Sequence, residues 1–264
     1  MSFSSNTKDE LSKLNNWTDK AVLKAELNGY FLTTNVTYNS SEILFTTENE
    51  CTAKRYAKIL QNLNTEYAKE EKGKLFIIKH SKIDNSEDID IENDNILVAV
   101  LRGAFMASGA INDPLKKYHL EIFVKSKENA KFLIYITEKF GINAKLLKRE
   151  KNYSVYLKEG QAISNLLALI GANKSVLDFE EIRVMREMKN NVNRLVNCET
   201  ANLTKIVNVA VKQIEDINYI ISKGRFDELT ENLKEIAQIR IENPDMSLEQ
   251  MGKLLEKPIG KSRS

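Results

Sequence analysis

The amino-acid sequence predicts an α+β domain built from two similar halves, followed by an all-α domain. The first observation is an internal repeat. LRGAFMASG at 101–109 has a weaker counterpart in LNGYFLTTN at 27–35, with leucine, glycine and an aromatic residue at matching offsets. The second is the order helix, hairpin, helix, strand, which occurs roughly twice. The third is the loss of strand patterns after Cys198, where only amphipathic helical patterns remain.

Length and composition limit the class of protein. The chain has 264 residues, 42% of them apolar, which suffices for one large domain or two modest ones with a hydrophobic core. No apolar run reaches the roughly 18 to 20 residues that span a bilayer, and the N-terminus does not resemble a secretory signal. Cys51 and Cys198 are too few for a disulfide framework or a zinc cluster. We therefore expect a cytoplasmic protein without membrane contact, and the net charge of +2 neither requires nor excludes nucleic acid.

The first half is predicted to begin with a short helix over 5–14, capped by Ser5 or Asn6. Its other elements follow from apolar spacing and turn residues: helix 19–33, a hairpin over 33–45 that turns at 39–41, helix 49–67 and strand 75–79. Residues 84–94 contain six acidic side chains and no basic one, which favours a solvated linker between the two repeats.

The second half repeats this pattern more clearly. We expect the motif helix at 95–109, and YHLEIFVK at 118–125 alternates as a half-buried strand does. The remaining elements are helix 126–140 with Gly141 as its C-cap, a hairpin of 144–149 and 153–158, and helix 159–170 ended by Gly171. A long charged helix over 176–196 would lead out of the domain. The predicted first domain is 1–190, with repeats at about 1–83 and 95–175.

The C-terminal residues 198–264 are predicted to form a second, helical domain. Helices are expected over 203–221 and 227–240, and the tripeptide at 243–245 (Asn-Pro-Asp) should break the chain. A third helix should begin at Ser247, because Ser247 and Gln250 have the spacing of a capping box.

The two motif helices resemble the paired helices of the LAGLIDADG homing endonucleases. Their small residues allow two backbones to approach closely. In that family a carboxylate one residue before the final glycine position holds a divalent metal, and these positions are Thr34 and Ser108 here. Glu26 and Asp113 are too far along the chain to take that place. The resemblance therefore predicts a retained scaffold without the metal chemistry: no enzyme, no catalytic residue, no metal and no cofactor.

Longer stretches resemble the WhiA family of bacterial sporulation and cell-division regulators. They are the opening MSFSSNTKDEL, LRGAFMASGAINDPLKKYHLEIF at 101–123, NVNRLVNCETANLTK at 191–205 and IRIENPDMSLEQMGKLL at 239–255. This resemblance implies a degenerate LAGLIDADG domain followed by a helix-turn-helix. It also implies binding to double-stranded DNA, possible contact with transcription or division proteins, and roles in transcription, cell division and chromosome segregation at the nucleoid.

In a helix-turn-helix the second helix contacts the bases. Residues 246–255 would form the first helix, 257–260 the turn, and Ser262 would begin a recognition helix that is almost absent, so either the chain is cut short or it is a shortened member of the family. The expected DNA-binding residues run from the third helix to the chain end: Ser247, Leu248, Glu249, Gln250, Met251, Gly252, Lys253, Leu254, Leu255, Glu256, Lys257, Pro258, Ile259, Gly260, Lys261, Ser262, Arg263 and Ser264.

A second DNA contact is expected on the hairpin at 144–158. Its basic residues could pair with phosphates, although a solubilising sheet edge explains them equally well: Lys145, Lys148, Arg149 and Lys151. His119 and Glu121 alternate on one strand and could share a metal, but two isolated ligands make a poor site, so a structural role is favoured for them.

Three hypotheses follow. The first is a non-enzymatic DNA-binding regulator of cell division and chromosome segregation, of the sporulation type. The alternative is a protein-interaction scaffold with weak DNA contact, which the acidic loop 84–94 favours. The least favoured is a metal-dependent nuclease.

Overall fold

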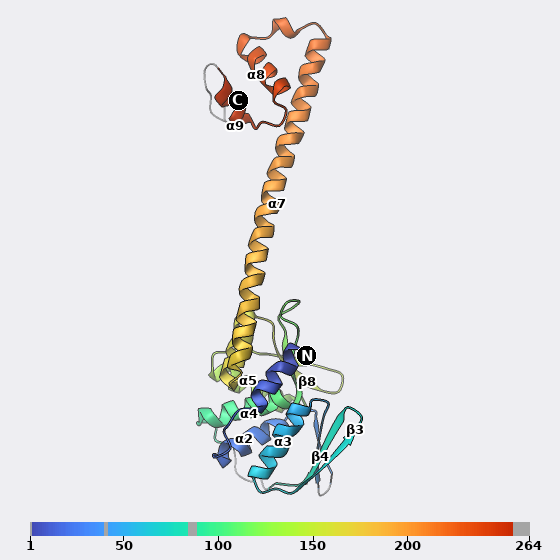
Figure 1. Ribbon diagram of the computed structural model, residues 1–264, viewed down its shortest axis with the longest axis vertical. Coiled ribbons are helices and arrows are strands. Elements are labelled where there is room, and N and C mark those ends of the chain that lie inside the picture. Colours follow the sequence, from blue (N-terminus) through green and yellow to red (C-terminus); the bar gives the residue numbers. More distant parts are fainter. Residues whose placement is uncertain (1, 40–41, 84–88, 256–264) are drawn as a thin grey trace. The chain divides into compact units, whose positions relative to one another are not determined.

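The computed structural model describes residues 2–39, 42–83 and 89–255, and the chain divides into two compact units, residues 1–186 and 187–264 (Figure 1). The first unit is α+β and contains both repeats. Every described element of the second unit is helical. The predicted fold class, a two-repeat α+β domain followed by a helical domain, is confirmed. Among the described residues, no helix is apolar over enough length to cross a lipid bilayer.

Each repeat contains two helices that alternate with two antiparallel strand pairs. In the first repeat these elements are α2 (Lys20–Phe31), β1 (Val36–Tyr38), β2 (Glu42–Thr47), α3 (Glu50–Asn62), β3 (Tyr67–Lys72) and β4 (Leu75–Ser81). In the second they are α4 (Asp94–Ser108), β5 (Gly109–Ile111), β6 (Leu120–Val124), α5 (Lys127–Lys139), β7 (Lys145–Lys148) and β8 (Tyr153–Leu157). The two four-stranded sheets have equivalent orders, β1-β2-β4-β3 and β5-β6-β8-β7, so the duplication inferred from the motif is confirmed.

Three further helices complete the first unit. They are α1 (Phe3–Ser12), α6 (Gly160–Ile170) and the beginning of α7 (Asn173–Ser222). Gly171 ends α6 with φ of +93°, a left-handed conformation that favours glycine. Among the described residues, the first repeat has no helix that corresponds to α6.

Polar caps position the helices, but the cap expected for the first helix is wrong: α1 begins at Phe3, and Ser2 Oγ accepts the Ser5 N–H at 3.2 Å, so neither Ser5 nor Asn6 is the cap. Asp19, Asn49 and Ser126 each accept a hydrogen bond from a backbone N–H in the first turn of α2, α3 and α5. Asn93 does the same for α4. Residues 84–88 of the expected acidic linker lie outside the described residues, and Asp94 is already the first residue of α4.

Two strands were not expected from the sequence. The helix predicted over 49–67 ends at Asn62, Asn64 takes a positive φ of 55°, and the chain turns into β3. The sequence of β3, YAKEEK, is mostly polar because the strand lies at the sheet edge and pairs only with β4. Strand β5 has three residues and follows directly from α4, so it is too short to show the alternation of buried and exposed side chains that identifies a strand.

The prediction of two separate helices at 176–196 and 203–221 is wrong. They belong to one 50-residue helix, α7, which continues through the polar stretch 197–202. The helix expected at 227–240 begins later: the short 3₁₀ turn η1 (Phe226–Glu228) precedes α8 (Glu231–Glu242). The third helix, α9 (Leu248–Leu254), begins after Ser247 as predicted.

The core lies where α2 and α4 cross. Gly29 and Gly103 face each other there: a Cβ at Gly29 would come within 2.0 Å of the carbonyl oxygen of Val100, and one at Gly103 within 1.9 Å of that of Glu26. Only glycine fits at these two positions, so the small residues of the motif allow the close helix contact that the sequence predicted.

Candidate nucleic-acid interface

The positions that hold metal-binding carboxylates in LAGLIDADG nucleases lie at the ends of the two motif helices. Ser108 joins the end of α4 to β6, because its Oγ donates to the Phe123 carbonyl at 2.7 Å and accepts from the Phe123 N–H at 3.1 Å. Thr34 Oγ1 donates to Asn35 Oδ1 at 3.3 Å. Both hydroxyls serve local structure and supply no negative charge for a cation.

The nearest acidic residue of this seam, Glu26, is fully buried and already paired. Arg55 contacts both of its carboxylate oxygens, with Nη2 at 2.8 Å from Oε2, and Arg102 Nη1 lies 3.4 Å from Oε2. Asp113 also serves local structure, since its Oδ1 accepts the backbone N–H of Leu115 at 3.0 Å. In the described ranges, no three His, Cys, Asp or Glu side chains are grouped to hold a metal.

His80 lies in β4, and His119 immediately precedes β6. His80 is buried, contacts the Tyr56 hydroxyl at 2.7 Å, and burial lowers its pKa. His119 Nε2 lies 3.3 Å from Glu121 Oε2 of β6, so the two side chains that the sequence placed on one face are in contact. Glu121 is also paired with Arg149, so its second oxygen is occupied. Burial raises the pKa of Glu121, but hydrogen bonds led by that from Arg149 outweigh this effect and leave the pKa lowered. The arrangement is an ion-pair cluster on the sheet.

The basic residues of the β7–β8 hairpin are all exposed, but they do not form one charged face. Lys145 and Lys148 are paired with Tyr156 and Tyr153 in the register, and residues three apart on a strand point to opposite faces. Arg149 is held by Glu121 and lies over the Phe123 ring at 5.8 Å. Lys151 is exposed in the turn between the strands. The four predicted contacts are therefore divided: Lys145 and Lys148 point to opposite faces of β7, Lys151 lies in the turn, and Arg149 is already paired.

In the second unit, α9 begins with the capping box that the sequence predicted. The Ser247 N–H donates to Gln250 Oε1 at 2.9 Å, and the Gln250 N–H donates to Ser247 Oγ at 3.3 Å. One face of α9 is buried, through Met251, Gly252 and Leu255 just beyond its end. The other face presents Glu249, Lys253 and Leu254 to solvent, and Lys253 Nζ lies 3.2 Å from Glu249 Oε1. The expected DNA-binding residues from Glu256 to Ser264 lie outside the described residues.

Sequence reasoning missed the role of Arg240 in the last turn of α8. This side chain is only 2% exposed and holds the loop before α9: its Nη1 donates to the carbonyl oxygens of Met246 at 2.7 Å and Pro244 at 3.3 Å. Its Nε donates to Gln213 Oε1 of α7 at 3.0 Å. The sequence offered one signal for this role: Arg240 stands three residues before an Asn-Pro pair, where a loop is expected.

The glycine-dependent helix seam, the duplicated sheets and the C-terminal helices with the capped α9 define a LAGLIDADG-like domain followed by a helix-turn-helix domain. The family model described as the WhiA LAGLIDADG-like domain matches residues 97–189, and that of the WhiA C-terminal HTH domain matches residues 192–263. The chain belongs to the WhiA family.

Curated relatives align with this sequence over nearly its whole length. A probable cell division protein WhiA of Thermoanaerobacter sp. (strain X514) is 40% identical over 297 aligned positions, which cover 99% of this chain and 93% of the relative. The protein of the same name in Alkaliphilus metalliredigens (strain QYMF) is 38% identical with the same coverage. The crystal structure of full-length DUF199/WhiA from Thermatoga maritima is similar with a TM-score of 0.69 and 25% identity, covering 100% of this chain and 94% of that one.

Proposed function

We propose that this protein is a non-enzymatic DNA-binding regulator of cell division and chromosome segregation that acts in transcription, of the sporulation type, at the nucleoid. The observation that carries the proposal is the match of residues 192–263 to the WhiA C-terminal HTH domain, with α8 and the capped α9 formed within it. Relatives named as probable cell division proteins support the cellular role.

The DNA contact is proposed for the exposed face of α9 and the residues that follow it, 247–264. Lys253 is the described cation of this face, and its exposure lets it exchange Glu249 for a phosphate, since such surface pairs are weak. A second contact is proposed through the hairpin. Lys145, Lys148 and Lys151 are available there, whereas Arg149 would first have to leave Glu121.

The experiment is fluorescence anisotropy of a labelled duplex with the full chain over a series of salt concentrations. Lys253→Glu should weaken binding and reduce the slope of log K against log salt by about 1, because one phosphate contact is lost. Lys145→Glu with Lys148→Glu tests the hairpin. Lys82→Glu, the same charge change at an exposed residue before α4, is the control. Binding that does not weaken as salt rises would contradict the proposal.

The absence of enzymatic activity is proposed from the chemistry of the seam. Thr34 and Ser108 are neutral, and Glu26 is neutralised by two arginines in the core. We expect no cleavage of a plasmid at any Mg²⁺ concentration, measured on agarose gels. Cleavage that requires Mg²⁺ and is lost when Asp113 is changed to Asn would support a nuclease instead.

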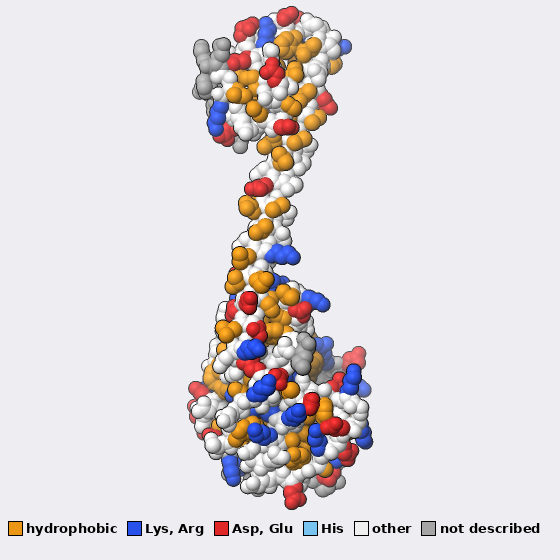
Figure 2. Space-filling view, in the orientation of Figure 1, with side chains coloured by type: hydrophobic (Ala, Val, Ile, Leu, Met, Phe, Trp, Pro, Cys, Tyr) orange, Lys and Arg blue, Asp and Glu red, His pale blue; other side chains and the backbone are white. Residues whose placement is uncertain are grey.

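A protein-interaction scaffold is the second candidate, and α7 favours it. Figure 2 shows hydrophobic side chains exposed along this helix, and within the second unit they include Met188 (64% exposed), Val192 (58%) and Leu195 (61%). Exposed apolar side chains in a row are typical of a contact surface. Changing Val192 and Leu195 to serine should abolish capture of a division or transcription protein while leaving the anisotropy titration unchanged.

A further inference from the structure

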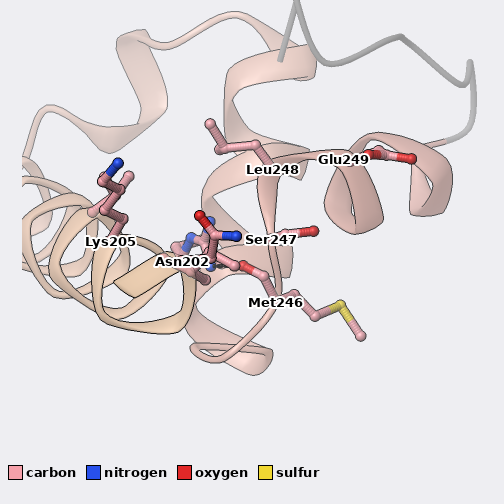
Figure 3. Close-up of a pocket in the computed structure, with 9 residues that line it drawn as sticks. Asn202, Lys205, Met246, Ser247, Leu248 and Glu249 are labelled. Atoms are coloured by element: carbon pink, nitrogen blue, oxygen red, sulfur yellow. Dashed lines mark hydrogen bonds between the residues drawn. The ribbon is translucent and has the colours of Figure 1, made fainter. Parts of the chain in front are cut away.

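The second unit contains a groove that shares Ser247, Leu248 and Glu249 with the proposed DNA-contact segment and is otherwise lined by residues outside it. It has a volume of about 410 Å³, within the range of small-molecule sites, and lies between α7, the end of α8 and the start of α9 (Figure 3). Lys205, Ile206 and Val209 of α7 form one side, and Leu248 of α9 lies on another. The groove therefore combines aliphatic walls with a few polar groups.

Arg240 gives this groove a buried positive charge. The side chain is 2% exposed, and the partners that it has in the described part of the chain are neutral: the Gln213 amide and two carbonyl oxygens. Burial lowers its pKa, and no described carboxylate forms an ion pair with it. A guanidinium can donate five hydrogen bonds in a planar fork, and a buried charge is costly without an anion. The site is thus suited to an anion.

Two further features fit an anion with an apolar part. Lys205 is exposed at the groove and has no partner within the described residues. The one carboxylate of the lining, Glu249, is directed away from Lys205 in Figure 3 and is paired with Lys253 at 3.2 Å. It therefore leaves the positive side of the groove uncompensated.

We propose that this groove binds a carboxylate carried on an aliphatic chain. The carboxylate would lie between Arg240 and Lys205, and the chain would pack against Ile206, Val209 and Leu248. A DNA phosphate fits less well, because a phosphodiester is strongly hydrated and is contacted by exposed cations, whereas Arg240 is only 2% exposed. This site goes beyond the proposed function and does not depend on it.

Isothermal titration calorimetry of the full chain with decanoate, below its micelle concentration, tests the proposal. Decanoate should bind with one site per chain, and acetate and decylamine at least about tenfold more weakly, because each lacks one half of the recognised chemistry. Decanoate and the peptide acetyl-Leu-Leu-Glu-amide present the same carboxylate and aliphatic groups, one as a lipid and the other as a protein segment. The one with the lower Kd identifies which of the two the groove recognises.

Variants locate the site. Lys205→Glu should weaken decanoate binding at least about tenfold, whereas Lys212→Glu, the same change at an exposed residue two turns along α7, should not. Arg240→Gln should abolish binding; if circular dichroism shows that the loop has unfolded, Lys205→Glu carries the test. Three outcomes would each overturn the proposal. They are equal binding of decylamine, decanoate binding that is unchanged by Lys205→Glu, and binding of a DNA duplex but no decanoate through Lys205.

Discussion

At the scale of single residues, two glycines fix the distance between the motif helices. Gly29 and Gly103 let the backbones of α2 and α4 meet, and a methyl group at either would overlap a backbone carbonyl oxygen. Backbone atoms in a packed core cannot move aside as a flexible side chain can. The repeat motif is therefore explained by packing and needs no catalytic role.

Gly103→Ala tests this seam. We expect a loss of about 3 kcal/mol in the free energy of unfolding, a decrease of roughly 6–12 °C in Tm, because the new Cβ would overlap the Glu26 carbonyl. Gly160→Ala is the control: its Cβ would meet the flexible Arg183 side chain at 3.0 Å, which can move. Thermal melts of both variants that decrease equally would contradict the packing argument.

Lys8 provides a prediction on pH. The residue lies in α1 and is 9% exposed, and burial lowers its pKa to about 8. Between pH 8 and 10.5 the unfolded chain holds this proton more tightly than the folded one, so the charge destabilises the fold at pH 7 and the penalty fades as pH rises. Lys8→Met should raise the free energy of unfolding by about 1–3 kcal/mol at pH 7.

Urea denaturation of the wild type and of Lys8→Met at pH 7 and pH 10.5 measures this effect. The difference between the two proteins should shrink at the higher pH, and taking a difference cancels the other groups that titrate there. A gap that stays constant across this range would mean that the lysine charge does not control the stability.

At the scale of elements, polarity misled the sequence-based assignment twice. Strand β3 is polar because it lies at the edge of its sheet, where most of its side chains are exposed. Its sequence, YAKEEK, is as compatible with a continued helix as with a strand. In α7 the polar stretch 197–202 resembles a loop, but none of its residues is a proline or glycine, and the helix continues through it.

Thr200→Pro tests the continuity of α7. A proline in a helix interior removes a hydrogen bond and costs about 3 kcal/mol or more locally. We therefore expect lower helicity by circular dichroism and faster amide hydrogen exchange over residues 192–208, whereas Thr200→Ala should leave both unchanged. If proline is tolerated without these effects, the two helices expected from the sequence are separate after all.

At the scale of the whole molecule, buried apolar side chains are distributed unequally. The main core cluster extends from Leu11 to Phe179 and contains no residue of the second unit. In the described part of the second unit, the buried apolar side chains are Ala210, Ala237, Met251 and Leu255. Hydrophobic stabilisation follows buried area, so the first unit should be the more stable of the two.

This imbalance predicts the behaviour of the two proposed domains when separated. Residues 1–190 should melt within about 3 °C of the full chain, because no core residue is removed. Residues 198–264 should show a low, broad transition. Differential scanning calorimetry of both pieces checks this, and a piece 1–190 that does not fold would show that its core depends on the second domain.

The sequence by itself determined the duplication, the fold class, the capping box of α9 and the loss of the metal-binding acids. Each of these depends on residues close together in the chain, such as Ser247 with Gln250, or on identity alone, as at Thr34 and Ser108. Tertiary structure alone decided the burial of Glu26 between two arginines, the capture of Arg149 by Glu121 and the contact of Arg240 with Gln213 beside the groove. These contacts join residues 27 to 76 positions apart, and no local period or propensity encodes which distant side chains will meet.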